Sequence, residues 1–260
     1  MSGLHMVHIP LAPHDLARIA GQRGWTRATA RDPVGTFDEG VALHHLSVEA
    51  FGPGALRPFR LMVAPGGRSA ALYGYSHHSA DALRGTAHAI APPEIADLMS
   101  PEGLRAKPMP QNWTAGQRVG FDLRVRPVRR LKKAVGGRRP GAEIDVFVHE
   151  ALSRFDADEN GMLASGRSRA AVYGDWLAER LAGDGIARLE GPAALASFAR
   201  ERAVRKGRAV EGPAAVLRGT LVIERPAAFA DLLHRGIGRH TAYGYGMVLL
   251  RAPQEQPIGE

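Results

Sequence analysis

The chain has 260 residues, of which 45% are hydrophobic, so it can bury one large core or two small ones. It carries 34 Lys and Arg against 26 Asp and Glu, and the resulting formal charge of +8 favours a polyanionic partner such as nucleic acid. It contains no cysteine, which excludes disulfides, thiolate metal ligands and a cysteine nucleophile.

The first 131 residues predict one α/β unit. Alternating residues indicate a strand at 4–12, with one face running from His5 to Leu11, and a short helical pattern then lies within an otherwise loop-like segment, 13–37. An apolar stripe predicts a helix from Asp38 to about Phe51, where Gly52 ends it. Strands at 57–64 and 69–75 flank a Pro-Gly-Gly hairpin signal. A helix at 79–90, a proline-broken loop and a strand at 117–126 complete the order β, α, β, β, α, β of a ferredoxin-like unit.

The second half predicts a similar but decorated unit. Residues 129–166 turn basic and then polar, which is typical of a domain junction. A helix at 168–182, a strand at 217–224, a helix at 226–235, a glycine-rich loop and a strand at 246–251 follow. We therefore expect an α/β (α+β) chain of two tandem ferredoxin-like (RRM-like) domains, at 1–131 and 167–260, with a linker insertion at 132–166.

The sequence predicts neither export nor a membrane span. The start lacks a basic segment followed by an apolar region, and no stretch approaches the roughly 18 consecutive apolar residues that a span requires. We expect a cytoplasmic protein.

Residues 234–250, HRGIGRHTAYGYGMVLL, form the most specific segment. Its glycines lie between a predicted helix and the last strand, where the backbone is free to turn tightly and approach a ligand closely. A phosphate backbone is a suitable ligand, because cationic side chains lie among the glycines. The alternative is a helix end with Gly236 in the left-handed conformation, followed by a sharp entry to the strand. The candidate RNA-binding residues of this segment are Arg235, Gly236, Gly238, Arg239, Gly244 and Gly246.

Two further groups of basic residues are candidates for RNA contact. Arg124 and Arg126 share one face of a predicted strand, and the second group surrounds Gly207, where a hairpin or helix could enter an RNA groove. The alternative for each group is a solvated charged surface. The candidates are Arg124, Arg126, Arg129 and Arg130 in the first group and Arg200, Arg202, Arg205, Lys206 and Arg208 in the second.

The sequence predicts no metal site and no cofactor. Asp156, Asp158 and Asn160 begin like a calcium loop, but Arg167 stands where the loop requires a bidentate glutamate. The glycine-rich segment follows a helix and precedes a strand, which is the reverse of a dinucleotide fingerprint.

The glycine-rich segment resembles the corresponding loop of repeat-associated RNA-binding proteins of CRISPR systems. Further blocks resemble those of the CasE family in the same order: DEGVALHHLSVEAFG with RPFRL, ALYGYS, FDLRVRPVRR, VYGDWLAERL and EGPAAVLRGTLVIE. The resemblance covers most of the chain. It implies two ferredoxin-like domains, a CRISPR repeat RNA hairpin as ligand, and a place in the type I-E Cascade complex of antiviral defence. The implied protein partners are other Cascade subunits, including the guide-RNA backbone protein.

The resemblance also implies a catalytic histidine. In CasE proteins it lies on the first helix of the N-terminal domain, in a Leu-His pair shortly before a Phe, which here falls on His44. RNA cleavage without a metal needs a group that exchanges protons near neutrality while the 2′-hydroxyl attacks phosphorus, and histidine suits this role. The implied enzyme is a metal-independent endoribonuclease that cuts at the stem base, leaves 2′,3′-cyclic phosphate and 5′-hydroxyl ends, and retains the hairpin at the 3′ end of the crRNA.

The supporting catalytic groups stay open. His45 competes with His44, although on a helix it points about 100 degrees away. CasE proteins often carry a tyrosine one turn before the histidine, where this sequence has Val41, so Tyr243, Tyr245, His240 or a cationic side chain are the alternatives for stabilising the transition state. The rival function is a non-catalytic RNA-binding scaffold subunit of a CRISPR effector complex.

Overall fold

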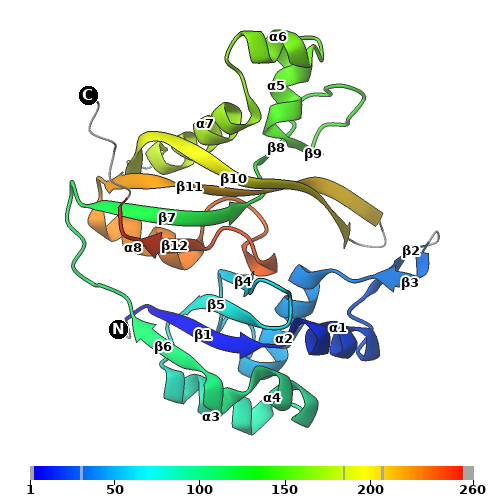
Figure 1. Cartoon of the computed structure of the whole chain (residues 1–260), viewed down its shortest axis with the longest axis vertical. Helices are drawn as coiled ribbons and strands as arrows, with labels where there is room; N and C mark the ends of the chain where they lie inside the picture. Colours follow the sequence, from blue (N-terminus) through cyan, green and yellow to red (C-terminus); the bar gives the residue numbers. More distant parts are fainter. Residues whose placement is uncertain (1–2, 30–31, 184, 206–207, 254–260) are drawn as a thin grey trace.

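The computed structural model describes residues 3–29, 32–183, 185–205 and 208–253. Most of its described strands form two four-stranded antiparallel sheets, which lie one above the other in Figure 1, and the other described strands pair separately as two two-stranded sheets. No described helix is both long enough and apolar enough to cross a lipid bilayer.

The first sheet has the order β4-β5-β1-β6. Its strands are β1 (His5–Leu11), β4 (Phe59–Val63), β5 (Ala70–Ser76) and β6 (Arg105–Pro108). Numbered along the chain, this is the order 2-3-1-4 of a ferredoxin-like unit, with α2 (Glu39–Phe51) and α3 (Ala80–Ile90) as its two helices. Additional elements are α1 (Pro13–Gln22), the β2–β3 hairpin (Arg27–Thr29, Asp32–Thr36), α4 (Pro93–Met99) and the short helix η1 (Pro101–Gly103).

The second sheet repeats the same order as β10-β11-β7-β12. Its strands are β7 (Arg118–Val125), β10 (Ala187–Arg205), β11 (Arg208–Ile223) and β12 (Val248–Arg251), and its helices are α7 (Arg169–Ala182) and α8 (Pro226–Arg235). The short helix η2 (Thr241–Tyr243) lies in the glycine-rich loop between α8 and β12. The prediction of two tandem ferredoxin-like domains is therefore confirmed.

One strand belongs to a different sheet from the one predicted. The segment 117–126 does form a strand, β7, but it pairs with β11 and β12 and so begins the second sheet instead of closing the first. The fourth strand of the first sheet is β6, which lies in the segment predicted to be a proline-broken loop and pairs with β1. Most of β6 is solvent-exposed and it lies at a sheet edge, so it lacks the apolar alternation that marks a strand in the sequence. Divided by sheets, the chain changes domain between Pro108 and Arg118, before residue 131.

The segment predicted as a linker insertion contains regular structure. It follows β8 (Val128–Arg130) and includes β9 (Glu143–Asp145), α5 (Val146–Arg154) and α6 (Glu159–Ala164), which Figure 1 shows above the second sheet. Phe147 and Met162 are buried in the core of the second domain. These residues therefore pack as part of the second domain.

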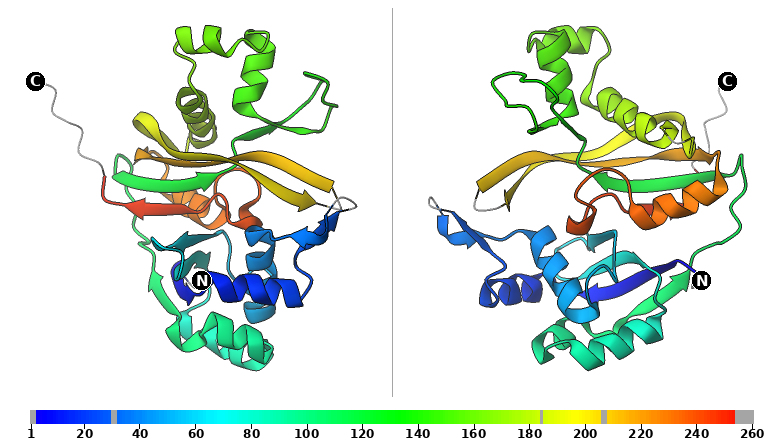
Figure 2. Two further views of the ribbon diagram at one scale, coloured as in Figure 1. Left: turned by 45° about the vertical axis from the view of Figure 1, so that its right-hand side comes forward. Right: turned by 180° about the vertical axis from the view of Figure 1, so that it is seen from behind.

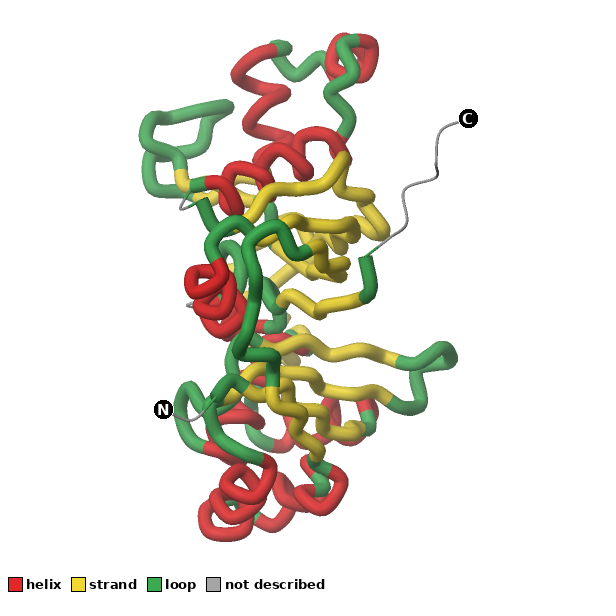
Figure 3. The backbone as a smooth tube through the Cα atoms, turned by 90° about the vertical axis from the view of Figure 1, so that its left-hand side faces the viewer, coloured by secondary structure: helices red, strands yellow, loops and turns green. Residues whose placement is uncertain are grey.

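The first sheet is covered on both faces. Val7, Ile9 and Leu11 of β1 pack with residues of α1 to α4 in one core, whereas Met6 and Tyr75 face the core of the second domain. Figure 3 shows the strands of the two sheets stacked between outer helices. The Tyr75 hydroxyl donates to the Val248 carbonyl oxygen of β12 at 2.8 Å, and this hydrogen bond ties the two sheets together.

An ionic cluster also joins the sheets. Asp122 of β7 has no exposed surface and accepts from Arg60 of β4, whose side chain is 7% exposed. Arg218 and Arg251 reach the other carboxylate oxygen of Asp122 at 2.7 and 3.0 Å. Burial by itself raises the pKa of Asp122, but the hydrogen bonds and charges of Arg60 and Arg218 outweigh it, so the pKa is lowered. The carboxylate therefore stays charged between the two sheets.

Candidate active site

Helix α2 presents His44 at the edge of the domain interface. Asp38 caps the helix, its side chain accepting from the Val41 amide at 3.1 Å, and Gly52 ends it with a φ of 86°. Leu43 and Leu46 are buried and fix the helix on the first core, while His44 between them is half-buried. Val41 is only 1% exposed and packs into the interior.

The glycine-rich loop of the second domain meets α2 beside this histidine. The Tyr243 and His44 rings lie 5.3 Å apart, and Figure 2 (right) shows the loop after α8 reaching α2. A Cβ atom on Gly40 would lie 2.5 Å from the Tyr243 carbonyl oxygen, closer than real Cβ contacts. The glycine at position 40 therefore allows η2 to approach α2 and brings Tyr243 to His44.

A small cavity opens next to the two rings. It has a volume of about 70 Å³, and His44, Ser47 and Arg57 are its polar lining residues. The Ser47 side chain is 3% exposed, and its hydroxyl oxygen has no hydrogen-bond partner among the described residues. Arg57 is exposed and donates from Nε and one terminal nitrogen to the Thr241 hydroxyl at 3.2 and 2.9 Å, which ties it to the loop. A proton-exchanging ring, a hydroxyl and a cation thus surround a space where a phosphate oxygen could be held.

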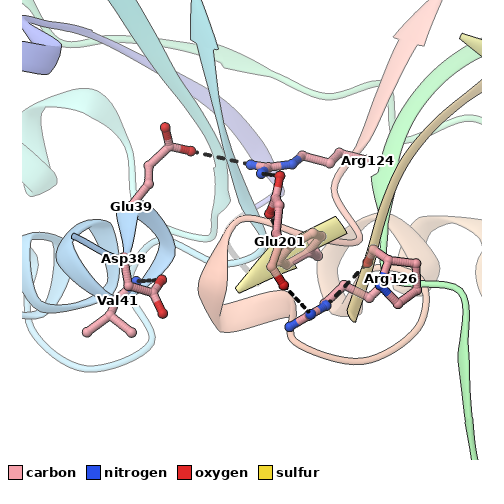
Figure 4. A network of polar contacts seen from close by, with 8 residues as sticks. Asp38, Glu39, Val41, Arg124, Arg126 and Glu201 are labelled. Carbon is pink, nitrogen blue, oxygen red and sulfur yellow. Dashed lines mark hydrogen bonds and ion pairs between the residues drawn. The ribbon is translucent and has the colours of Figure 1, made fainter. Parts of the chain in front are cut away.

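Arg124 and Arg126 take part in an internal network that Figure 4 shows from close by. Arg124 donates to Glu39 of α2 at 3.3 Å and to Glu201 of β10 at 2.6 Å. Arg126 is 4% exposed and donates to the Glu201 and Pro213 carbonyl oxygens. The two arginines do share a face, but it is turned inward and joins α2 to the second sheet; RNA contact by them stays a prediction.

Tyr245 completes this network. Arg124 and Arg126 lie 4.8 and 5.6 Å from the centre of its ring, and its hydroxyl donates to Glu201. Burial is the main reason why the pKa of Tyr245 is raised, and burial likewise raises the pKa of Glu39, although Arg124 opposes it there. Tyr245 therefore stays protonated as a structural hydrogen-bond donor.

Two glycines of the loop are required by its own geometry. Gly236 and Gly246 have φ values of 75° and 80°, and a Cβ atom on Gly246 would lie 2.6 Å from the Ile237 carbonyl oxygen. The Ile237 amide donates to the Gly246 carbonyl oxygen at 2.9 Å, and the Gly246 amide donates to the Arg124 carbonyl oxygen at 2.7 Å. The loop is thus closed on itself and fastened to β7. Gly236 ends α8 with a positive φ, but its ψ of 175° lies outside the left-handed helical region that the helix-end alternative predicted.

The other histidine candidates contact different groups. The His45 ring is stacked on Trp25 at 5.6 Å and also lies 5.6 Å from the His44 ring, in an edge-to-face arrangement. His240 contacts Glu143 of β9 at 2.9 Å, and hydrogen bonding to His240 is the main cause of the lowered pKa of Glu143. Among the three candidates for support of His44, Tyr243 is the one from the second domain whose ring packs directly on it.

The remaining basic candidates fall into two regions. Arg129, Arg130, Arg235 and Arg239 line one hollow together with Gly236 and Gly238. Arg200 faces Glu211 at 3.4 Å, and Arg202, Arg205 and Arg208 lie on the long β10–β11 hairpin. Lys206 and Gly207 lie outside the described residues. The sequence left a hairpin and a helix as alternatives for this segment, and the hairpin is confirmed.

Three functional candidates were not singled out in the sequence: Ser47, Arg57 and Arg180, which also lines the hollow. Arg57 did stand in the RPFRL block, so the resemblance held a signal for it. Ser47 and Arg180 also stand in matching blocks, DEGVALHHLSVEAFG and VYGDWLAERL, but no local pattern distinguishes either one from the other polar residues of its helix.

Comparison with known families and structures gives consistent results. A family model described as CRISPR associated protein matches residues 4–252. Comparison with curated proteins gives no significant match.

Solved structures with the same fold include a CRISPR endoribonuclease Cse3 bound to a 19-nucleotide RNA, at 19% identity and a TM-score of 0.63, covering 96% of this chain and 100% of that one. Thermus thermophilus Cse3 bound to an RNA representing a pre-cleavage complex matches at 18% identity and a TM-score of 0.60, covering 96% and 99%. A chain of a CRISPR RNA-guided surveillance complex in a pre-nicking state matches at 16% identity and a TM-score of 0.55, covering 95% and 99%. At these identities the likeness establishes the fold, which is that of a CasE-type chain.

Proposed function

Because this chain belongs to the CRISPR-associated protein family, we propose that it is a CasE-type endoribonuclease that processes CRISPR precursor RNA. It binds the repeat stem-loop, cuts at the stem base without a metal ion, and stays bound to the hairpin as a subunit of a Cascade surveillance complex. The observation that carries the proposal is the meeting of His44 with Tyr243, Ser47 and Arg57 where the two domains join.

These residues suit cleavage by an internal nucleophile. The 2′-hydroxyl oxygen forms a bond to the adjacent phosphorus while the bond from phosphorus to the 5′-oxygen breaks, which gives a 2′,3′-cyclic phosphate and a 5′-hydroxyl. One proton leaves the 2′-oxygen and one reaches the 5′-oxygen, and His44 is placed to transfer a proton in this step. Arg57 supplies positive charge, and Tyr243 and Ser47 supply hydroxyl donors for the charge that develops on the phosphate oxygens.

The test is cleavage of the cognate repeat RNA in excess EDTA by the wild type, His44→Ala and the matched variant His45→Ala. General acid–base catalysis contributes about 10²–10⁴-fold to a rate. We therefore expect His44→Ala to lower the single-turnover cleavage rate by about 10²-fold or more while its affinity for the hairpin persists. His45→Ala should retain most of the cleavage rate, because His45 does not line the cavity and its ring is stacked on Trp25 as well as lying 5.6 Å from the His44 ring. Mapping the product ends should find a single cut with a cyclic phosphate.

A non-catalytic scaffold subunit is the second candidate, favoured by Val41 lying in the core where related proteins often have a tyrosine. Wild-type protein that binds the hairpin tightly but leaves it intact would establish the scaffold and contradict the enzyme.

A further inference from the structure

A large hollow adjoins the His44 cavity on the side of the second domain. It has a volume of about 690 Å³ and lies between β8, the ends of α7 and α8, and the glycine-rich loop. Of the described residues, six arginines line it against one glutamate. We name it the arginine groove; its arginines are Arg57, Arg129, Arg130, Arg180, Arg235 and Arg239.

The arginine groove and the His44 cavity share a wall. Arg57 lines both spaces, while the consecutive residues Thr241 and Ala242 line the groove and the cavity respectively. A chain that places one phosphate beside His44 can therefore continue past Arg57 into the groove without crossing the protein core.

The charges in the groove are only partly balanced by acidic partners. Arg129 contacts the ring nitrogen of His149 at 3.4 Å, and Arg130 donates to the Gly141 carbonyl oxygen at 3.0 Å, so both have neutral neighbours. Arg239 does pair with Glu143, at 2.5 Å. Like charges gathered in this way repel one another unless an anion lies between them.

Arg180 adds an unsatisfied donor. Its guanidinium lies 4.5 Å from the centre of the Trp176 ring, and its Nε atom is buried without a hydrogen-bond partner among the described residues. Burial is the main cause of a lowered pKa for Arg180, and the charges of Arg129 and Arg239 add to it. A buried donor of this kind normally has a partner, and an anionic oxygen in the groove would supply one.

Building on the proposed function, we infer that the arginine groove binds the backbone phosphates of the single-stranded RNA next to the cleaved bond. A duplex presents its phosphates on a broad convex surface, whereas this site is an open hollow bordered by β8, two helix ends and a loop. Trp176 is 4% exposed beneath Arg180, so no free aromatic face is offered to a base by this tryptophan. The groove therefore recognises the negative charge of the phosphates, and its affinity does not depend on the base sequence of the flank.

The test compares three repeat RNAs, each with a 2′-deoxy nucleotide before the cleaved bond so that binding is measured without cleavage. One ends at the hairpin base, one carries eight nucleotides 5′ of it and one carries eight nucleotides 3′ of it. The variant is Arg129→Gln/Arg130→Gln, two exposed positions on β8, and the control is Arg68→Gln, an exposed arginine in the β4–β5 turn. Arg180→Gln and Arg180→Lys form a second pair that separates charge from packing.

We expect the double variant to lose about tenfold or more in affinity for one of the two extended RNAs. The RNA that is affected shows whether the groove binds the 5′ or the 3′ flank. The slope of log affinity against log salt should fall by about 1.4, since each single-strand phosphate contact contributes about 0.7. The affinity of the double variant for the hairpin alone should stay within twofold of the wild-type value, and so should the affinity of Arg68→Gln for all three RNAs. Arg180→Lys should retain more affinity for the extended RNA than Arg180→Gln.

Equal losses of affinity for all three RNAs would mean that the groove binds the hairpin itself. No loss of affinity for any of them would mean that the arginines only stabilise the protein around the helix ends. Either result overturns the inference. Both results leave cleavage by His44 untouched. Failure of the wild type to bind any of the RNAs would instead refute the proposed function, and this inference with it.

Discussion

The approach of η2 to α2 can be tested by adding a single methyl group. Gly40→Ala places a Cβ atom 2.5 Å from the Tyr243 carbonyl oxygen and 3.2 Å from the Tyr243 Cβ atom. Because the first partner is backbone, the η2 segment must shift by about 0.5–1 Å to reach an ordinary contact. Gly40 has no positive φ, so the helix itself tolerates alanine and any loss of stability or activity comes from this contact.

The expected magnitudes follow from two opposing terms. Alanine in place of glycine in a helix stabilises by roughly 0.5–1 kcal/mol, whereas overpacking a fitted contact costs about 1–3 kcal/mol. We therefore expect Gly40→Ala to lower the free energy of unfolding by about 0–2.5 kcal/mol. A displacement near 1 Å at a catalytic site costs on the order of 100-fold in rate, so single-turnover cleavage should fall by that order while hairpin affinity changes little.

Gly85→Ala on α3 is the matched control, because nothing lies within 4 Å of the Cβ position there. It should raise the free energy of unfolding by roughly 0.5–1 kcal/mol and leave cleavage unchanged. Urea unfolding followed by circular dichroism and single-turnover cleavage measure the two effects. Should Gly40→Ala be as stable and as active as Gly85→Ala, the tight contact between α2 and Tyr243 is not what positions the site.

Two further predictions concern the ionic cluster between the sheets. Asp122→Asn should lower the free energy of unfolding in urea by about 3–5 kcal/mol, because Arg60 is left buried without its counter-charge, whereas Asn at the exposed Asp97 should change it by less than about 0.5 kcal/mol. A double variant, Asp122→Asn with Arg60→Met, should recover part of the loss. Since the pKa of Asp122 is lowered on folding, its contribution to stability is complete above about pH 4, the unfolded value, and is lost as the pH falls through the folded value. An acid titration should accordingly find a smaller difference between wild type and Asp122→Asn at pH 2.5 than at pH 7, and an equal difference at both would contradict the assignment.

Local signals were sufficient for most individual elements. The helix that carries His44 runs from Glu39 to Phe51 with Asp38 as its cap, close to the predicted bounds, because a capping aspartate, an apolar stripe and a terminal glycine all act within a few residues. The β4–β5 hairpin and α8 followed in the same way from a Pro-Gly-Gly turn and a proline at the helix start. The order of these elements was enough to indicate ferredoxin-like units.

Sheet membership was beyond these local signals. The β7 sequence is typical of a buried strand in either sheet, and only the tertiary packing places it between β11 and β12. The exposed strand β6 ends in a proline and carries almost no strand signal, although it closes the first sheet. Likewise, the sequence indicated Arg124 and Arg126 as surface candidates, because the glutamates that pair with Arg124 and the carbonyl oxygens that accept from Arg126 lie far along the chain.

The sequence by itself determined the β4–β5 hairpin, the placement of His44 on a capped helix, and a glycine-rich loop ahead of the last strand. Only the tertiary structure decided what surrounds that histidine, because Tyr243 and Thr241 come from the other domain and the Arg57–Thr241 hydrogen bonds span 184 residues. The same packing assembles the arginine groove from four separate segments. Contacts over such separations depend on how whole sheets and helices fill space, which no window of neighbouring residues encodes.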